Sequence, residues 1–422
     1  MRGLHIGRRA AQFLCSAQQP SLSVCGSTAA LPTEPLRAAL PTLAAAFQLQ
    51  TRLVSGSRTT QGFMQGWQQP KPQESVAVDP FSLVREEIET VSERLRRSIM
   101  SDIPALERAA EYFFKLGSEG KRLRPSMLLL MASSLSSALP NALFLTVDEA
   151  PPNQHPTEQR RRQQRIAEIT EMIHVASLLH DDVIDNAATR RGLMSLNAFM
   201  GNKIAILAGD FLLARASVTL ASLRNTEVIE LLSQVIEHLV AGEILQMTST
   251  EDALVSLDHY VQKTFYKTAS LMANSCKAIA ILGGQPQEVA DLSWQFGRHL
   301  GLAFQFVDDI LDFTSSASTL GKPALNDLKS GIATAPVLFA AEEFPELRPL
   351  ILRKFKSSSD VQRAQQLVFR SQGIQRTRAM AADHAGMAAK SIQDMPPTDA
   401  LHALACRQAL IDLTAKVLTR TK

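Results

Sequence analysis

Two short acidic clusters hold the side chains in this sequence best suited to chemistry. The first is Asp181-Asp182-Val183-Ile184-Asp185 and the second is Asp308-Asp309-Ile310-Leu311-Asp312, each with the pattern DDxxD in strongly apolar surroundings. On a helix, residues four apart share a face and lie about 6 Å apart along the axis. Carboxylates in apolar sequence are costly to bury without a cation. The repeated spacing therefore predicts a site for divalent cations.

The oxygen-only character of the clusters favours Mg²⁺. Carboxylate oxygens are hard ligands, and Mg²⁺ is usually shared between a few carboxylates and a substrate phosphate. No His or Cys stands at zinc-site spacing, and Glu168-Ile169-Thr170-Glu171 lacks the ExxH pair of a di-iron bundle. We expect Mg²⁺ to be bound by six aspartates: Asp181, Asp182, Asp185, Asp308, Asp309 and Asp312.

Basic side chains accompany the acidic clusters. Lys121 and Arg124 lie three apart in the segment 120–125, Arg190-Arg191 follows the first cluster, Lys267 lies in an apolar-patterned segment, and Lys322 follows the second cluster. Ammonium and guanidinium groups that face Mg²⁺-binding carboxylates indicate a polyphosphate held between them.

Helices must position these residues. Apolar residues make up 45% of the 422-residue chain and aromatic residues only 5%, and Leu and Ala dominate, which favours an all-α fold. Apolar residues recur at three- and four-residue steps from about residue 79 to the end, as in Phe81, Val84, Ile88 and Val91. Four prolines and a basic run in 140–162 predict a surface loop there.

The N-terminal segment has the composition of an organelle transit peptide. Residues 1–73 contain seven basic residues and one acid, Glu34, among many Ser, Thr, Gln and Ala. We expect a mostly disordered transit peptide over 1–76, a catalytic domain over 77–422, and a mitochondrial location, with the plastid as the alternative. The four cysteines form no CxxC pair, which indicates free thiols.

Composition also excludes two classes of partner. The net charge is only +3, which argues against nucleic-acid binding through the overall field of the protein. No uninterrupted apolar run reaches the ~18–20 residues of a transmembrane helix. We therefore expect a soluble or peripheral protein with no membrane span.

Taken together, the motifs resemble one family. The sequence is similar to the trans-polyprenyl diphosphate synthases of the isoprenoid-synthase fold over essentially all of 79–422, and most of all to long-chain synthases of the solanesyl type from plant organelles. The resemblance implies a single large helical bundle around a central cavity. The matching segments are 120–125, 173–185, 190–192, Gly209-Asp210, Lys267-Thr268 and 304–312.

The resemblance also implies roles for single residues, with two or three Mg²⁺ ions per active site. The diphosphate of isopentenyl diphosphate would be held by Lys121, Arg124, His174 and Arg191. The allylic diphosphate would be held by Arg190, Lys267, Thr268, Gln305 and Lys322. His174 stands seven residues before Asp181, two helical turns back on the same face.

The implied reaction is ionisation of an allylic diphosphate, attack by isopentenyl diphosphate, and loss of a proton. Ala176 and Ser177, one turn before Asp181, are small, so no bulky floor stops the growing chain near the metal site. The missing floor predicts a long product, about C40 to C50. The resemblance implies C45 within that range and a role in supplying the side chain of ubiquinone or plastoquinone. The resemblance further implies a homodimer.

Two departures and two alternatives qualify this hypothesis. Position 119 is Glu where the family usually has Gly, and position 332 is Ile where many members have Lys, so no phosphate contact is assigned to Ile332. A terpene cyclase is one alternative, although its second metal site usually has an Asn/Ser/Glu pattern. A non-catalytic subunit of a heteromeric synthase is the other, although both acidic clusters are intact here.

Overall fold

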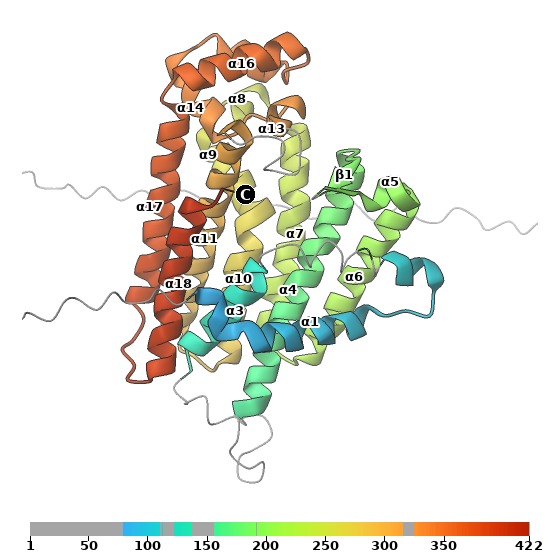
Figure 1. The fold of residues 1–422 in the computed structure, drawn as a ribbon, viewed down its shortest axis with the longest axis vertical. Coiled ribbons are helices and arrows are strands. Elements are labelled where there is room, and N and C mark those ends of the chain that lie inside the picture. Colours follow the sequence, from blue (N-terminus) through green and yellow to red (C-terminus); the bar gives the residue numbers. More distant parts are fainter. Residues whose placement is uncertain are drawn as a thin grey trace, which may run out of the picture. The chain divides into compact units, whose positions relative to one another are not determined.

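The computed structural model describes residues 79–109, 112, 122–136, 156–190, 192–314 and 325–421. The chain divides into two units, Met1–Glu74 and Ser75–Lys422. The first unit lies outside the described residues, and the second is the helical unit drawn in colour in Figure 1.

The described part of the second unit is almost entirely helical, as the composition predicts. Its early elements are η1 (Pro80–Val84), α1 (Arg85–Ile99), α3 (Leu123–Ser134), α4 (Pro156–Ile184), α5 (Leu196–Met200), α6 (Asn202–Ser222) and α7 (Thr226–Thr248). Next come α8 (Glu251–Leu254), α9 (Leu257–Thr264), η3 (Phe265–Ala269), α10 (Ser270–Leu282) and α11 (Gln287–Thr314). The last are α13 (Asn326–Lys329), α14 (Ala335–Glu343), α15 (Leu347–Leu352), α16 (Ser358–Arg370), α17 (Gly373–Gln393) and α18 (Leu401–Thr419).

Within the described residues, the strands form one two-stranded antiparallel hairpin. β1 (Thr189–Arg190) pairs with β2 (Leu193–Met194), with Thr189 opposite Met194. Gly192, at φ +78°, takes a left-handed conformation in the turn between them, which glycine adopts at little cost. The hairpin directly follows α4 and so places Arg190 next to the first acidic cluster.

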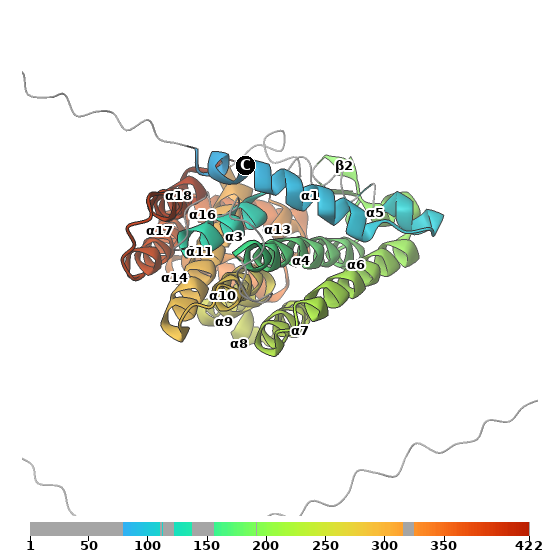
Figure 2. The same cartoon turned by 90° about the horizontal axis from the view of Figure 1, so that it is seen from below.

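The two helices that carry the acidic clusters lie in the interior of the bundle. Figure 2 shows α4, α10 and α11 between the pair α6 and α7 on one side and the pair α17 and α18 on the other. Gly297 and Gly301, one turn apart on α11, allow α11 to approach α10 closely. A Cβ on Gly297 would lie 2.5 Å from the carbonyl oxygen of Met272, and one on Gly301 would lie 2.6 Å from Cα of Ala269. This contact fixes the second cluster relative to the segment that carries Lys267.

The loop expected over 140–162 is wrong at its C-terminal end, because α4 begins at Pro156. Proline is well tolerated in the first turn of a helix, where its missing N–H has no partner to lose. The remainder, 140–155, lies outside the described residues. Arg160, the first arginine of the basic run, is not a surface side chain: it bonds the carboxylate of Glu87, the hydroxyl of Ser133 and the carbonyl oxygen of Leu129. Arg161 is exposed.

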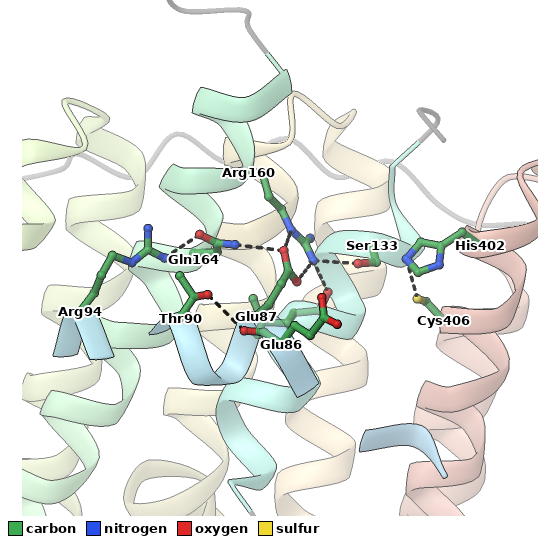
Figure 3. Close-up of polar contacts among 10 residues, drawn as sticks. Glu86, Glu87, Thr90, Arg94, Ser133, Arg160, Gln164, His402 and Cys406 are labelled. Atoms are coloured by element: carbon green, nitrogen blue, oxygen red, sulfur yellow. Dashed lines mark hydrogen bonds and ion pairs between the residues drawn. The ribbon is translucent and has the colours of Figure 1, made fainter. Parts of the chain in front are cut away.

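A polar network fastens α1 to α3 and α4 (Figure 3). Nε of Arg160 donates to Oε1 of Glu87 at 2.8 Å, and Gln164 donates to the same oxygen at 3.0 Å. Arg94 in turn bonds Gln164 at 2.5 Å and forms an ion pair with the buried Glu168. These bonds hold α1 across the end of α4 opposite to the acidic cluster.

Among the described helices, α6 is long and apolar enough to cross a membrane by length and composition alone. Asp210 and Arg215 interrupt its apolar sequence. A helix in a soluble bundle passes the same test, so this is weak evidence for a span. Cys276 and Cys406 are free thiols, as expected, and both are buried.

Candidate active site

The first acidic cluster occupies the C-terminal end of α4 and the turn after it. Asp182 is buried and its Oδ1 accepts two hydrogen bonds from Arg190, at 2.7 Å from Nε and 2.6 Å from Nη2. Its Oδ2 is buried without a hydrogen-bond partner. Burial raises the pKa of Asp181 to about 6 and also raises the pKa of Asp185. The cluster thus has more buried negative charge than the protein neutralises, which fits a bound cation.

The second cluster lies near the C-terminal end of α11, and two of its three carboxylates are buried. Asp309 accepts hydrogen bonds from the hydroxyl of Tyr260 and from Nε2 of Gln305, and burial raises its pKa to about 6. Asp312 accepts the backbone N–H groups of Asn326 and Asp327 at 3.1 and 3.2 Å, at the start of α13.

Asp308 is the partly exposed member of this cluster. Its Oδ1 lies 2.7 Å from Nη2 of Arg420, near the C-terminus of the chain. The Arg420 guanidinium also stacks on the ring of Phe304, 3.8 Å from its centroid. A protein cation therefore contacts a carboxylate that the sequence assigns to a metal.

A π-helical segment, η3, brings the expected ligands of the allylic diphosphate to the two clusters. Lys267 forms an ion pair with Glu243 of α7, and Thr268 donates to Oε1 of Gln305 at 2.9 Å. Gly242 allows this approach, because a Cβ there would lie 2.8 Å from Cγ of Lys267. π-Helical turns inside α-helices are frequent at functional sites.

Two of the four residues expected to bind isopentenyl diphosphate contact each other. Nη1 of Arg124, in the first turn of α3, lies 3.1 Å from Nε2 of His174 on α4. Because guanidinium only donates, His174 accepts this bond at Nε2. Lys121, Arg191 and Lys322 lie outside the described residues, as does Glu119.

The expected chain-length residues differ in their direction on α4. With 100° per residue, Ser177 lies about 40° around the axis from Asp181, whereas Ala176 lies about 140° away. Ser177 donates its hydroxyl to the carbonyl oxygen of His174, and Ala176 is fully buried. Ser177 therefore shares the face of Asp181 more closely than Ala176 does, although both stand one turn before it.

Comparison with known proteins identifies the family to which the chain belongs. The family model for polyprenyl synthetase matches residues 103–368. The chain belongs to this family. It is a trans-prenyltransferase that makes long-chain all-trans polyprenyl diphosphates, which rules out the terpene cyclase alternative.

Named relatives agree with this placement of the synthase. Mitochondrial solanesyl-diphosphate synthase 1 of Oryza sativa subsp. japonica is 52% identical over 82% of this chain and 79% of its own length. Solanesyl diphosphate synthase 3 of Arabidopsis thaliana, named chloroplastic/mitochondrial, is 52% identical over 82% of this chain and 81% of its own. Both names agree with the expected organellar location.

Solved structures share the fold of the synthase. An apo Arabidopsis medium/long-chain length prenyl pyrophosphate synthase superposes with a TM-score of 0.67 and is 46% identical, over 82% of this chain and 100% of that one. A Caulobacter crescentus polyprenyl synthase complexed with calcium and isoprenyl diphosphate gives a TM-score of 0.70 at 29% identity, over 82% and 98%. These matches confirm the isoprenoid-synthase fold.

The structure adds residues to the site of the synthase that sequence reasoning missed. Tyr260 and Lys263 belong to α9, Glu243 to α7, and Arg420 follows α18. Lys263 stands one turn before Lys267, a spacing that was a usable signal. Tyr260, Glu243 and Arg420 carry no such signal, because each reaches its partner only through the packing of distant helices.

A cleft of about 270 Å³ lies beside the first acidic cluster and extends to a hydrogen-bond partner of the second. Asp185 of the first cluster lines it, together with Tyr260, which bonds Asp309 of the second, and Lys263. Within the described residues, no three His, Cys, Asp or Glu side chains are grouped closely enough to hold a metal ion. The carboxylates are instead distributed between the cleft and the protein partners named above.

Proposed function

We propose that this synthase makes a solanesyl, C45, diphosphate by adding isopentenyl diphosphate to an allylic diphosphate with the help of Mg²⁺, and that its product supplies a quinone side chain. The observation that carries the proposal is the shared cleft, which Asp185 of one DDxxD cluster and Tyr260, the partner of Asp309 in the other, both line. The names of the plant relatives support the solanesyl length.

The six aspartates divide the work of holding two or three Mg²⁺ ions. Asp181, Asp185 and Asp308 are at least partly accessible and would present their carboxylates to the ions. Asp182, Asp309 and Asp312 are buried and bonded to the protein, and would meet an ion through the oxygens that these bonds leave free, such as Oδ2 of Asp182. Mg²⁺ held by these carboxylates would stabilise the negative charge on the leaving diphosphate.

The chain's own side chains bind and orient both substrates. Arg190, Lys267, Thr268 and Gln305 surround the clusters and would hold the allylic diphosphate, with Lys322. Arg124 and His174 would hold isopentenyl diphosphate, with Lys121 and Arg191. Ionisation of the allylic C–O bond releases diphosphate and leaves a carbocation, which the double bond of isopentenyl diphosphate attacks. Loss of a proton from the new cation then gives the elongated allylic diphosphate. The apolar helix faces must exclude water from that cation.

Purified protein assayed alone tests the proposal. With Mg²⁺, an allylic primer and isopentenyl diphosphate, we expect elongation to C45, read by chromatography of the products.

Asp181→Ala and Asp308→Ala should each reduce turnover by orders of magnitude, because each loses a carboxylate that faces the cations and a polyanion. Turnover within about tenfold of wild type in both variants would contradict the proposal that both clusters bind metal ions. A folded wild-type protein without activity would favour the non-catalytic subunit.

We further infer a homodimer through the outer face of α6 and α7, which lies at the edge of the bundle in Figure 2. Large apolar side chains are exposed on these two helices, among them Leu207, Val218, Val240 and Ile244. Exposed apolar surface of this kind marks an association site. A second copy is the occupant that fits best, because two identical apolar faces can cover each other around a two-fold axis.

A further inference from the structure

The cleft beside Asp185 is lined by a second lysine besides Lys263. In addition to α9, it is lined by the segment 330–333, which follows α13, and by Lys354, in the turn between α15 and α16. Lys263 of α9 and Lys354 therefore line the same space as Asp185. Ile332, where many family members have Lys, also lines it.

The backbone of the turn fixes the position of Lys354. Lys354 and Phe355 both have positive φ, +54° and +48°, which non-glycine residues rarely adopt. Hydrogen bonds from their N–H groups to Ile351 and Leu350 close the turn, at 2.9 and 3.1 Å. Phe355 is buried in the core. These hydrogen bonds and the burial of Phe355 thus offset the conformational free energy that two left-handed residues cost.

Two neighbours complete this support. Arg353 makes a two-pronged ion pair with Asp360, at 2.9 and 2.7 Å, at the start of α16. Gly331 lies against Lys354 so closely that a Cβ on it would be 3.0 Å from Cβ of Lys354. The turn therefore holds the base of the Lys354 side chain against the cleft rim, while its ammonium group makes no ion pair within the described residues.

The other charges in the cleft already have partners or opposite neighbours. Glu243 pairs with Lys267. Burial lowers the pKa of Lys263, and the nearby negative charge of Asp309 partly offsets this effect. Asp185, the remaining acid of the cleft, belongs to the cluster proposed to meet the allylic diphosphate through Mg²⁺. Because Asp185 and Lys354 line the same cleft of about 270 Å³, a diphosphate bound in that cleft would lie between the metal side and the unpaired ammonium group.

We propose that Lys354 is a binding residue for the allylic diphosphate, and that it supplies from the α15–α16 turn the positive charge that position 332 lacks. The inference rests on the allylic site of the proposed function. An ammonium group suits this role, because it is a compact charge with three donors on a flexible stem.

Steady-state kinetics and direct binding on the full-length protein test this inference. Lys354→Met should raise KM for the allylic primer, and its Kd measured by calorimetry with Mg²⁺, about tenfold, the effect of one charged hydrogen bond. KM for isopentenyl diphosphate should change less than about twofold, since the lost charge faces the other substrate. Lys356→Met is the matched control, because Lys356 is also exposed, stands two residues along and does not line the cleft.

Two more variants separate charge from the shape of the turn. Lys354→Arg should keep most of the affinity, and Lys354→Met combined with Ile332→Lys should recover it, because Ile332 lines the same cleft. A primer affinity in Lys354→Met equal to that of Lys356→Met overturns the inference. So does a loss that neither Lys354→Arg nor the double variant restores. In either case wild-type elongation would leave the proposed function standing.

Discussion

At the scale of single residues, the active site holds charge that its own partners do not balance. Asp181 and Asp309 both have a pKa raised to about 6, and burial is the main cause in each. Asp182 keeps one buried oxygen without a hydrogen bond. Natural proteins tolerate such groups where function needs them, and the cost is a less stable fold.

Asp181 therefore allows a prediction about stability and pH in the absence of metal. Its pKa lies above the ordinary value of 3.8, so its charged form opposes folding. That penalty is fully present above pH 6 and disappears as the pH falls from about 6 to 4. The Asp181→Asn side chain carries no charge and avoids this penalty. With EDTA at pH 8, the free energy of unfolding of the variant should therefore exceed that of the wild type by up to about 3 kcal/mol.

Urea unfolding at several pH values measures this difference. The advantage of Asp181→Asn should shrink as the pH falls below 6, and the variant should be inactive. Asp399→Asn, at an exposed position, is the control and should show no such trend. A variant less stable than wild type at pH 8 would contradict this account of Asp181.

At the scale of elements, α4 has a catalytic end and a structural end. Its C-terminal end carries the first acidic cluster, and its N-terminal half is held by the network around Arg160 and Glu87 (Figure 3). Removal of one member of a partly buried ion pair leaves the other charge without compensation.

Glu87→Ala should therefore destabilise the protein by about 2–4 kcal/mol, because Arg160 would keep its charge in a largely buried position. Glu89→Ala, two residues away and exposed on the same helix, should change stability by less than about 0.5 kcal/mol. Chemical unfolding of the two variants gives the comparison. Equal stabilities would show that the network contributes nothing beyond a surface pair.

The face of α4 below Asp181 makes a prediction about product length. A Phe at Ala176 or Ser177 would place a floor one turn beneath the metal site, so each variant should stay active and release shorter products, about C15 to C20. Chromatography of the products decides the matter. Because Ser177 shares the face of Asp181 more closely, Ser177→Phe should have the larger effect. Active variants with the wild-type distribution would place length control elsewhere.

At the scale of the whole molecule, the surface of the helical unit matters for assembly. The exposed face of α6 and α7 leaves Val218 and Val240 67% and 60% exposed. Light scattering should show a dimer for the wild type and a monomer for Val218→Asp combined with Val240→Asp, because buried charge disfavours association. Leu401→Asp on α18, where the leucine is 79% exposed, should remain dimeric. A dimeric double variant would exclude this face.

The N-terminal segment makes a separate prediction about location. Residues 1–76 fused to a fluorescent protein should direct it into mitochondria or plastids, since the segment is basic and almost without acids. Residues 77–422 should keep elongation activity without it. Microscopy and fractionation give the answer, and a fusion that stays in the cytosol would refute the targeting role.

The amino-acid sequence by itself determined what depends on neighbours along the chain. The helical periodicity, the i, i+4 spacing within each DDxxD cluster, and the pairing of Lys267 with Thr268 are all local, because a helix places residues three and four apart on one face. The end of the expected loop was wrong for a local reason too: a proline suits the first turn of a helix as well as a loop.

Only the tertiary structure decided which protein partners the aspartates meet. Asp308 meets Arg420 and Asp309 meets Tyr260, across sequence separations of 112 and 49 residues. Lys354 reaches the cleft from a turn in which Lys354 and Phe355 are left-handed. The buried ring of Phe355 and the ion pair between Arg353 and Asp360 hold this turn in place. Such contacts depend on how helices pack, for example through Gly297 and Gly301. Spacing along one helix carries no information about a partner on another, because interhelical packing sets that distance.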